Sequence, residues 1–197
     1  MMFDDATIAR NVKAALRKRM RGLRNTMPAA ACATRSEAIA GALDALPELA
    51  AARHVALFHP IEERHEVDLR PFDAALRTRG VSVYYPAIDP DSRIMSFRFV
   101  DDLETLEERG LGFREPADSA PLAAQLDVIV VPCLAADPSG HRLGYGAGFY
   151  DRALPLHPAA WTVAVAYDFQ LLVEIPRQPL DVPVRALVTD VRTLRVV

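Results

Sequence analysis

The chain has 197 residues, close to the usual size of one domain; 51% are hydrophobic, 25% are charged, and the formal net charge is −3. This composition excludes an intrinsically disordered chain, and no apolar run approaches the roughly 20 residues that span a bilayer. Two cysteines are too few for a disulfide scaffold and the N-terminus lacks the apolar segment of a secretory signal, so we expect a cytoplasmic protein. We also expect one domain over residues 1–197 and a monomer.

Residues 6–26 predict the first helix, because apolar side chains recur there at steps of three and four: Ile8, Val12, Leu16, Met20, Leu23 and Met27. A basic stripe follows the same period: Arg10, Lys13, Arg17, Arg21 and Arg24. Like charges four residues apart repel by a few tenths of a kcal/mol per pair. The stripe therefore indicates either an anion that neutralises it or a solvated face. Because the rest of the chain is acidic, we expect no nucleic-acid partner.

Helical and strand-like patterns then alternate. Further helices are predicted at 29–46, 67–79, 101–109 and 149–156. Strands are predicted at 55–58, 81–85, 94–100, 127–131, 161–166 and 186–188, with a weaker signal at 194–197. Pro86 and Pro132 are expected to end the second and fourth strands. The alternation favours an α/β fold with a mostly parallel sheet and a ligand crevice at the carboxyl ends of its strands.

The segment 142–152, Arg-Leu-Gly-Tyr-Gly-Ala-Gly-Phe-Tyr-Asp-Arg, carries the strongest chemical signal. Its three alternating glycines lie between a buried strand and a helix, where free backbone N–H groups make an anion site. The G-x-G-x-G spacing matches neither the Rossmann motif nor the P-loop, so neither nucleotide-binding motif applies. The chemistry of the segment alone still favours phosphate binding over a loop that is merely flexible. Asp151 is either a carboxylate that stabilises the following helix or a magnesium ligand beside bound phosphates.

The glycine segment and the strand before it resemble the 5-formyltetrahydrofolate cyclo-ligase family, also called 5,10-methenyltetrahydrofolate synthetases. The matching pattern is Asp127-Val-Ile-Val-Val-Pro132, followed by Asp137-x-x-Gly140-x-Arg142-Leu-Gly144-x-Gly146-x-Gly148-Phe-Tyr150-Asp151. Three shorter pieces agree in order and spacing: Lys13-x-x-x-Arg17, Phe58 through Glu66-Val67-Asp68, and Glu115-Pro116. The resemblance covers about residues 10–190.

The resemblance implies a three-layer α/β sandwich related to sugar-phosphate isomerases and CoA transferases. It implies conversion of 5-formyltetrahydrofolate to 5,10-methenyltetrahydrofolate with ATP and Mg²⁺, through an N5 iminium phosphate, releasing ADP and phosphate. Carried over by position, the ATP-binding residues would be Lys13, Arg17, Arg142, Leu143, Gly144, Tyr145, Gly146, Ala147, Gly148, Phe149 and Tyr150. Arg142 would also neutralise charge in catalysis, Asp151 would bind Mg²⁺, and Glu66 would hold the pterin. His59 lies at the end of a predicted strand, where it is either a further substrate contact or a surface or packing residue.

Several positions depart from the family pattern. Ala147 stands where some members have Lys, and Arg185 stands where some have a metal-binding acid, for which Asp181 or Asp190 could substitute. The segment before Glu66 is about two residues longer, which makes Glu62 and Glu63 rivals for the pterin. The alternatives are a paralogous ATP-using enzyme with another substrate, or a non-catalytic folate-binding or RNA-binding protein.

Cys133 follows a strand end beside the expected crevice. A thiol there is either reactive or a buried small side chain, and burial is the commoner case.

Overall fold

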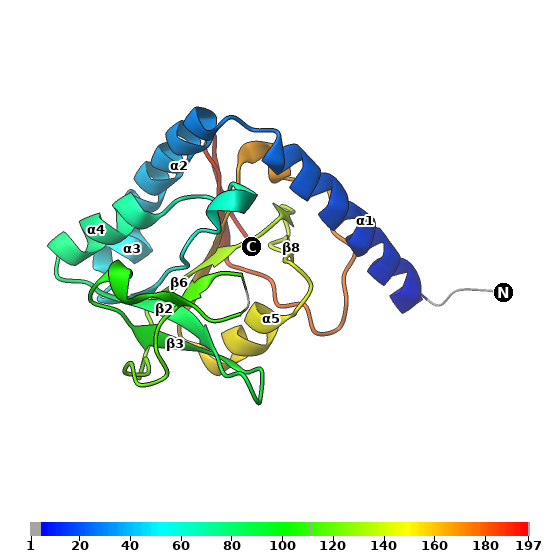
Figure 1. The fold of residues 1–197 in the computed structure, drawn as a ribbon. Coiled ribbons are helices and arrows are strands. Elements are labelled where there is room, and N and C mark those ends of the chain that lie inside the picture. Colours follow the sequence, from blue (N-terminus) through cyan, green and yellow to red (C-terminus); the bar gives the residue numbers. More distant parts are fainter. Residues whose placement is uncertain (1–4, 111, 197) are drawn as a thin grey trace.

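The computed structural model describes residues 5–110 and 112–196, and a seven-stranded sheet runs through its centre (Figure 1). Its strands are β1 (His54–Ala56), β2 (Ser82–Ile88), β3 (Met95–Phe99), β6 (Val128–Pro132), β9 (Trp161–Val165), β10 (Ala186–Val188) and β11 (Thr193–Arg195). They lie in the order β11-β10-β9-β6-β1-β2-β3. The five inner strands are parallel, and the two edge strands are antiparallel to their neighbours. The predicted α/β class with a mostly parallel sheet is confirmed.

Helices cover both faces of the sheet. One face carries α2 (Ala29–Asp44), α3 (Pro47–Ala51) and α4 (Arg70–Thr78), whose apolar side chains pack on alternate strand residues such as Val55 and Val130. The other face carries α5 (Phe149–Ala153) and the 3-10 turn Leu154–Leu156, which pack on Ile129 and Val131. This is the expected three-layer arrangement, since successive strand residues point to opposite faces. The long helix α1 (Asp5–Asn25) lies beside these layers (Figure 1).

Most predicted elements are confirmed with slightly shorter bounds. The predicted helix 149–156 divides into α5 and the 3-10 turn that contains Pro155, because proline cannot donate the next helical hydrogen bond. The predicted last strand corresponds to β11, and Val197 lies outside the described residues.

The predicted stop of the second strand at Pro86 is wrong, since β2 continues through it to Ile88. Pro86 pairs with Phe97 of β3. Val83 accepts a backbone hydrogen bond from Val100, and Asp89 donates one to Ile94. In an antiparallel ladder the bonded positions alternate, so Pro86 falls between two of them. Its nitrogen points away from β3, beyond the end of β1, and no sheet hydrogen bond is lost.

The predicted acidic helix over 101–109 is also wrong. The chain forms a 3-10 turn at Leu103–Thr105 and then β4 (Glu107–Glu108), which pairs with β5 (Arg114–Glu115). The carboxylate of Asp102 accepts the backbone N–H two residues on, at 3.0 Å. Such local bonds compete with helical ones, and too few apolar side chains are available here to bury a helix.

A hairpin precedes the glycine segment where the sequence pattern predicts only a loop. Its strands are β7 (Ala135–Ala136) and β8 (Arg142–Leu143). The buried carboxylate of Asp137 holds the turn: Oδ1 accepts two backbone N–H groups at 2.9 and 3.2 Å, and Oδ2 accepts the Ile175 N–H at 2.9 Å. Arg142 therefore lies on a fixed strand and not on a mobile loop.

The two stripes of α1 do not divide into a buried apolar face and an exposed basic face. Ile8, Val12 and Leu23 are exposed, while the basic residues Lys13 and Arg24 are only 3% and 2% exposed. The helix thus turns part of its basic stripe towards the body of the protein. Burying cations requires partners, and both have them, as described below.

Within residues 5–110 and 112–196, none of the helices combines the length and apolar character needed to cross a membrane.

Candidate active site

A cavity of about 840 Å³ opens at the carboxyl ends of the central strands. Phe58 follows β1, Ile88 ends β2 and Pro132 ends β6, and all three line it. The chain leaves β1 towards β2 in one direction and β6 towards β9 in the other, so the strand order reverses between β1 and β6. Ligand crevices in open α/β sheets form at this reversal.

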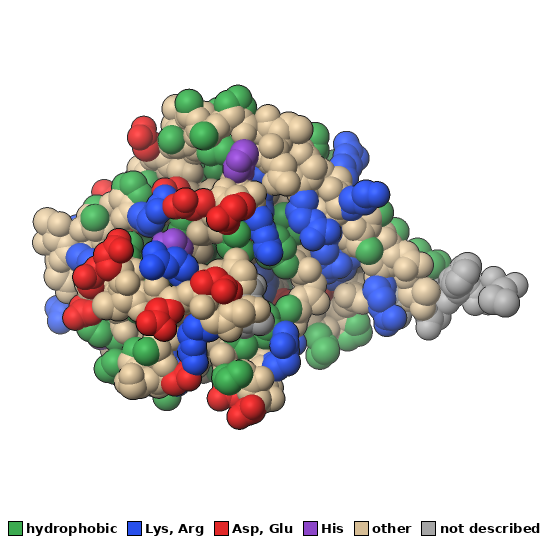
Figure 2. All heavy atoms as spheres, in the orientation of Figure 1, with side chains coloured by type: hydrophobic (Ala, Val, Ile, Leu, Met, Phe, Trp, Pro, Cys, Tyr) green, Lys and Arg blue, Asp and Glu red, His purple; other side chains and the backbone are tan. Residues whose placement is uncertain are grey.

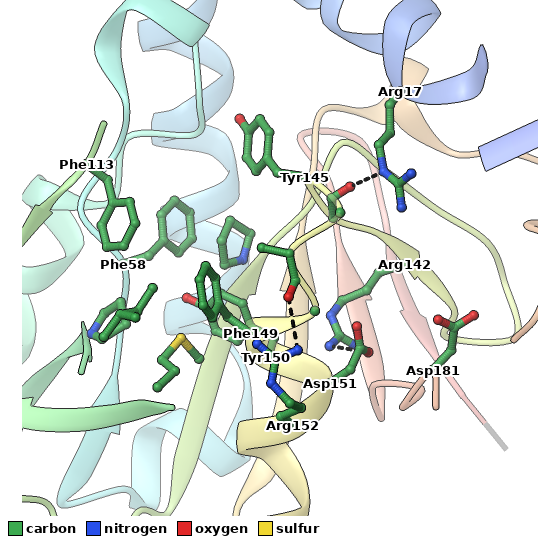
Figure 3. Close-up of a pocket in the computed structure, with 18 of the residues that line it drawn as sticks. Arg17, Phe58, Phe113, Arg142, Tyr145, Phe149, Tyr150, Asp151, Arg152 and Asp181 are labelled. Atoms are coloured by element: carbon green, nitrogen blue, oxygen red, sulfur yellow. Dashed lines mark hydrogen bonds and ion pairs between the residues drawn. The ribbon is translucent and has the colours of Figure 1, made fainter. Parts of the chain in front are cut away.

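The cavity has two chemically distinct ends. Figure 3 shows Phe58, Phe113 and Phe149 on one side, and Arg142 and Asp151 on the other with Arg17 and Asp181. The glycine segment lies between them. Figure 2 shows mainly Lys and Arg among the charged side chains over α1, whereas Asp and Glu side chains lie interspersed with Lys and Arg over the opposite side of this view. One end of the cavity can therefore bind an anion, and the other end can bind a flat apolar group.

The glycine segment lines the cavity from residue 144 to residue 148. Gly146 and Gly148 adopt φ of +107° and +67°, which side chains rarely tolerate. Arg17 fixes the segment from α1, because its Nε donates to the Gly144 carbonyl at 2.9 Å. The pKa of Arg17 is lowered by burial and by the neighbouring Arg21. Since α5 has only five residues, the expected helix contribution is small and the anion site depends on the loop and its cations.

Arg142 and Asp151 lie side by side at the charged end. Arg142 is 9% exposed, and its guanidinium donates to Asp151 Oδ1 at 2.9 Å and to the Val182 carbonyl. The Val182 N–H also reaches Asp151 Oδ1, at 3.2 Å. Both bonds fall on one oxygen, and in the part of the chain that the structure describes Oδ2 has no partner.

Lys13 reaches the same end from α1. Its ammonium forms an ion pair with Asp181, which lines the cavity, and donates to Gln178 at 3.3 Å. The other candidate acid, Asp190, instead pairs with Arg35 at 2.5 Å and does not line the cavity. Arg185 is exposed and reaches the Pro158 carbonyl at 3.4 Å.

Glu66 is the best placed of the three candidate glutamates. It is 7% exposed and lines the cavity, and Oε2 accepts the Ile61 N–H at 2.9 Å. Glu62 is exposed and pairs with Arg70 at 2.6 Å, and Glu63 is exposed. Neither of the two lines the cavity.

Of three other predicted residues, His59 and Tyr150 line the cavity and Leu143 does not. His59 lines the cavity, and burial lowers the pKa of its imidazole, so it is neutral at pH 7. The Leu143 side chain does not line the cavity and packs with Met20 and Ile175, so a contact of this residue with ATP would be made by its backbone. Tyr150 lines the cavity, and burial raises the pKa of its hydroxyl, which has no hydrogen-bond partner among the described residues.

Sequence reasoning missed two features of the cavity. Arg93 and Arg152 lie 5.5 and 5.4 Å from the ring centre of Phe149, within cation–π range. Arg93 comes from the turn between β2 and β3, and no motif marks it. Arg24 and Tyr145 form a buried group with Glu66; Arg24 belongs to the predicted basic stripe, but only the fold shows which of those cations turns inward.

Cys133 is expected to be unreactive. The thiol is 4% exposed, and burial raises its pKa to about 12. Because the thiolate is the nucleophile, the protonated thiol persists at pH 8, well below that pKa. An aromatic disulfide reagent at pH 8 should titrate at most one thiol, Cys32, in the native protein and both thiols in guanidinium. Two rapidly titrated thiols in the native protein would contradict this assignment.

Comparison with known proteins gives consistent matches over most of the chain. The sequence model of the 5-formyltetrahydrofolate cyclo-ligase family matches residues 9–190. The chain is 34% identical to 5-formyltetrahydrofolate cyclo-ligase of Escherichia coli (strain K12) over 151 residues, which are 73% of this chain and 81% of the relative. It is 48% identical to the enzyme of that name from Mycolicibacterium smegmatis over 94 residues, 45% of this chain and 47% of the relative. The NMR structure of Aquifex aeolicus 5,10-methenyltetrahydrofolate synthetase aligns with a TM-score of 0.82 and 32% identity, covering 94% of this chain and 93% of that one.

Proposed function

Because the chain belongs to the 5-formyltetrahydrofolate cyclo-ligase family, we propose that its cavity holds ATP at the charged end and 5-formyltetrahydrofolate at the aromatic end. The product is 5,10-methenyltetrahydrofolate, formed with release of ADP and phosphate. The division of one cavity into these two ends, with the glycine segment between them, is the observation that carries the proposal.

The charged end suits a triphosphate. Lys13, Arg17 and Arg142 converge on it from α1 and β8. The loop supplies backbone N–H groups, and the Tyr150 hydroxyl has no hydrogen-bond partner among the described residues. Phosphoryl transfer depends mainly on positioning and charge neutralisation, which these groups provide without a covalent nucleophile.

Asp151 fits the role of magnesium ligand. The described residues contain no group of three or more His, Cys, Asp or Glu side chains that could enclose a metal ion. Mg²⁺ on a nucleotide needs only one or two carboxylates, since phosphates and waters supply its other ligands. Asp151 offers its Oδ2, and Asp181 is a second carboxylate on the same cavity. When bound, the ion would neutralise phosphate charge.

The aromatic end suits a pterin. Phe58, Phe113 and Phe149 supply flat apolar surface, so we assign Phe149 to the pterin and not to ATP, which the resemblance implies for it. Glu66 is a fixed acceptor for the several N–H donors on the pterin edge, and the neutral His59 lies nearby.

We propose for this chain the chemistry that the family resemblance implies. The formyl oxygen attacks the γ-phosphorus of ATP, and the bond between this phosphorus and the oxygen that leaves with ADP breaks. The result is an N5 iminium phosphate. N10 then bonds to the formyl carbon and loses its proton, and the C–O bond to phosphate breaks. Arg142 lines the charged end of the cavity, and we assign it the catalytic role of neutralising the charge that develops in the first step. We also propose that the protein is a monomer and that it is located in the cytoplasm.

The test follows the ultraviolet band of the methenyl product. Purified protein with 5-formyltetrahydrofolate and Mg²⁺ should develop the band only when ATP is added. A protein that binds ATP but gives no band would favour a paralogous enzyme with another substrate. Binding of the folate without turnover would favour the non-catalytic alternative.

A further inference from the structure

Three side chains from distant segments form a buried group behind the aromatic end of the cavity. Arg24 in the last turn of α1 donates to the hydroxyl of Tyr145 in the glycine segment. That hydroxyl donates to Glu66 Oε1, and Arg24 Nη2 lies 3.8 Å from the same oxygen. Tyr145 and Glu66 line the cavity, but Arg24 does not. Arg24 therefore acts on the cavity only through its two partners.

Burying Arg24 in this arrangement lowers the stability of the fold, which is unexpected if the residue has only a structural role. Arg24 is 2% exposed, and its Nε has no hydrogen-bond partner among the described residues. Burying a cation with an incomplete set of hydrogen bonds costs free energy, and packed apolar side chains often replace such pairs without loss of stability. The fold alone thus does not explain an arginine at this position.

The partners show what Arg24 does. Glu66 Oε2 accepts the Ile61 N–H at 2.9 Å, and Oε1 accepts the Tyr145 hydroxyl. A carboxylate has about four acceptor sites, so these two bonds fix its plane and leave sites free for a ligand. Two cations lie near the Tyr145 ring: the guanidinium carbons of Arg24 and Arg64 are 5.8 and 4.9 Å from its centre. Burial and the adjacent Glu66 raise the pKa of Tyr145 to about 12, which keeps its hydroxyl a donor.

We infer that Arg24 is a positioning residue for folate recognition, holding the Tyr145 hydroxyl and through it the Glu66 carboxylate in the orientation that receives the pterin N–H groups. This inference rests on the proposed function, in which Glu66 binds the pterin. It also means that α1 serves both ends of the cavity, with Lys13 and Arg17 at the charged end and Arg24 at the other.

The experiment measures equilibrium binding of 5-formyltetrahydrofolate and of ATP, separately, by calorimetry. R24Q should weaken folate binding about tenfold, the size of coupling typical of groups in direct contact, and leave ATP binding within about twofold. R24K, which keeps the charge, should recover part of the loss. R19Q is the matched control, because Arg19 is exposed on the same helix, and it should change neither affinity.

A double-mutant cycle separates positioning from general destabilisation. R24Q leaves the buried Glu66 without its cation and lowers stability, whereas R24Q/E66Q removes both charges. If Arg24 acts through Glu66, the double variant should bind folate as E66Q does. Additive losses, equal losses for ATP and folate, or an unchanged folate affinity of R24Q would each overturn the inference. If R24Q does not fold, the comparison of E66Q with R24Q/E66Q still decides it. A wild-type protein that binds no folate would instead refute the proposed function.

Discussion

Replacing Arg142 with alanine is expected to lower kcat/KM for ATP, at saturating folate, by about 10²–10³-fold. The buried guanidinium touches Asp151 and the Val182 carbonyl at the charged end of the cavity. Loss of one preorganised donor aimed at developing charge costs about this much. The rate of appearance of the methenyl band, at varied ATP, measures the effect. The unfolding midpoint should fall only slightly, since Asp151 keeps its hydrogen bond from the Val182 N–H. The loss of activity would therefore not come from unfolding.

The matched control is Arg185→Ala, which removes an exposed arginine from outside the cavity. It should leave kcat/KM within about twofold of the wild type, as surface substitutions usually have small effects. If Arg142→Ala retained more than a tenth of the wild-type kcat/KM, Arg142 would not be the catalytic cation, and Lys13 and Arg17 would be the remaining candidates.

Replacing Gly140 with alanine is expected to destabilise the fold by about 2–4 kcal/mol. Gly140 adopts φ of +81°, and a Cβ there would lie 2.4 Å from the Val184 carbonyl oxygen and 3.0 Å from a methyl carbon of Val196. The Gly140 carbonyl also accepts the Val184 N–H at 2.9 Å, which joins the β7–β8 turn to the segment that contacts Arg142. Denaturant unfolding measures the loss, and activity should fall with it.

Gly22→Ala is the control, because this glycine lies within α1 and a Cβ there meets nothing within 4 Å. Alanine has the higher helix propensity, by up to about 1 kcal/mol. The control should therefore be neutral or more stable. A Gly140→Ala protein as stable as the wild type would show that the turn can move away from Val184.

The parts of the site that lie close together in sequence could be predicted. The glycine segment and the buried strand before it predict a loop at the carboxyl ends of the strands, and the structure places residues 144–148 on the cavity wall there. Arg142 and Asp151 are nine residues apart on this segment, and the structure joins them. Local patterns fail where a neighbouring strand determines whether a residue is tolerated. Pro86 is tolerated within β2 because β1 ends before it, and no local signal on β2 reveals where β1 ends.

The side-chain partners from distant segments could not be predicted. Arg24 and Glu66 are 42 positions apart, and only the packing of α1 brings them within 3.8 Å. The two stripes of α1 have the same period, so periodicity alone cannot tell which one faces inward. The apolar stripe is the usual choice, and here Ile8 and Val12 remain exposed.

The way in which α1 is attached constrains how this sequence can evolve. Its inward contacts are made largely by Lys13, Arg17 and Arg24, with Met20 the one fully buried apolar side chain among its described residues. A mutation that replaced these cations by tighter apolar packing would strengthen the fold and damage the ligand site at the same step, a conflict between stability and activity. Selection for greater stability is therefore directed to the outer face of the helix, where this conflict does not arise.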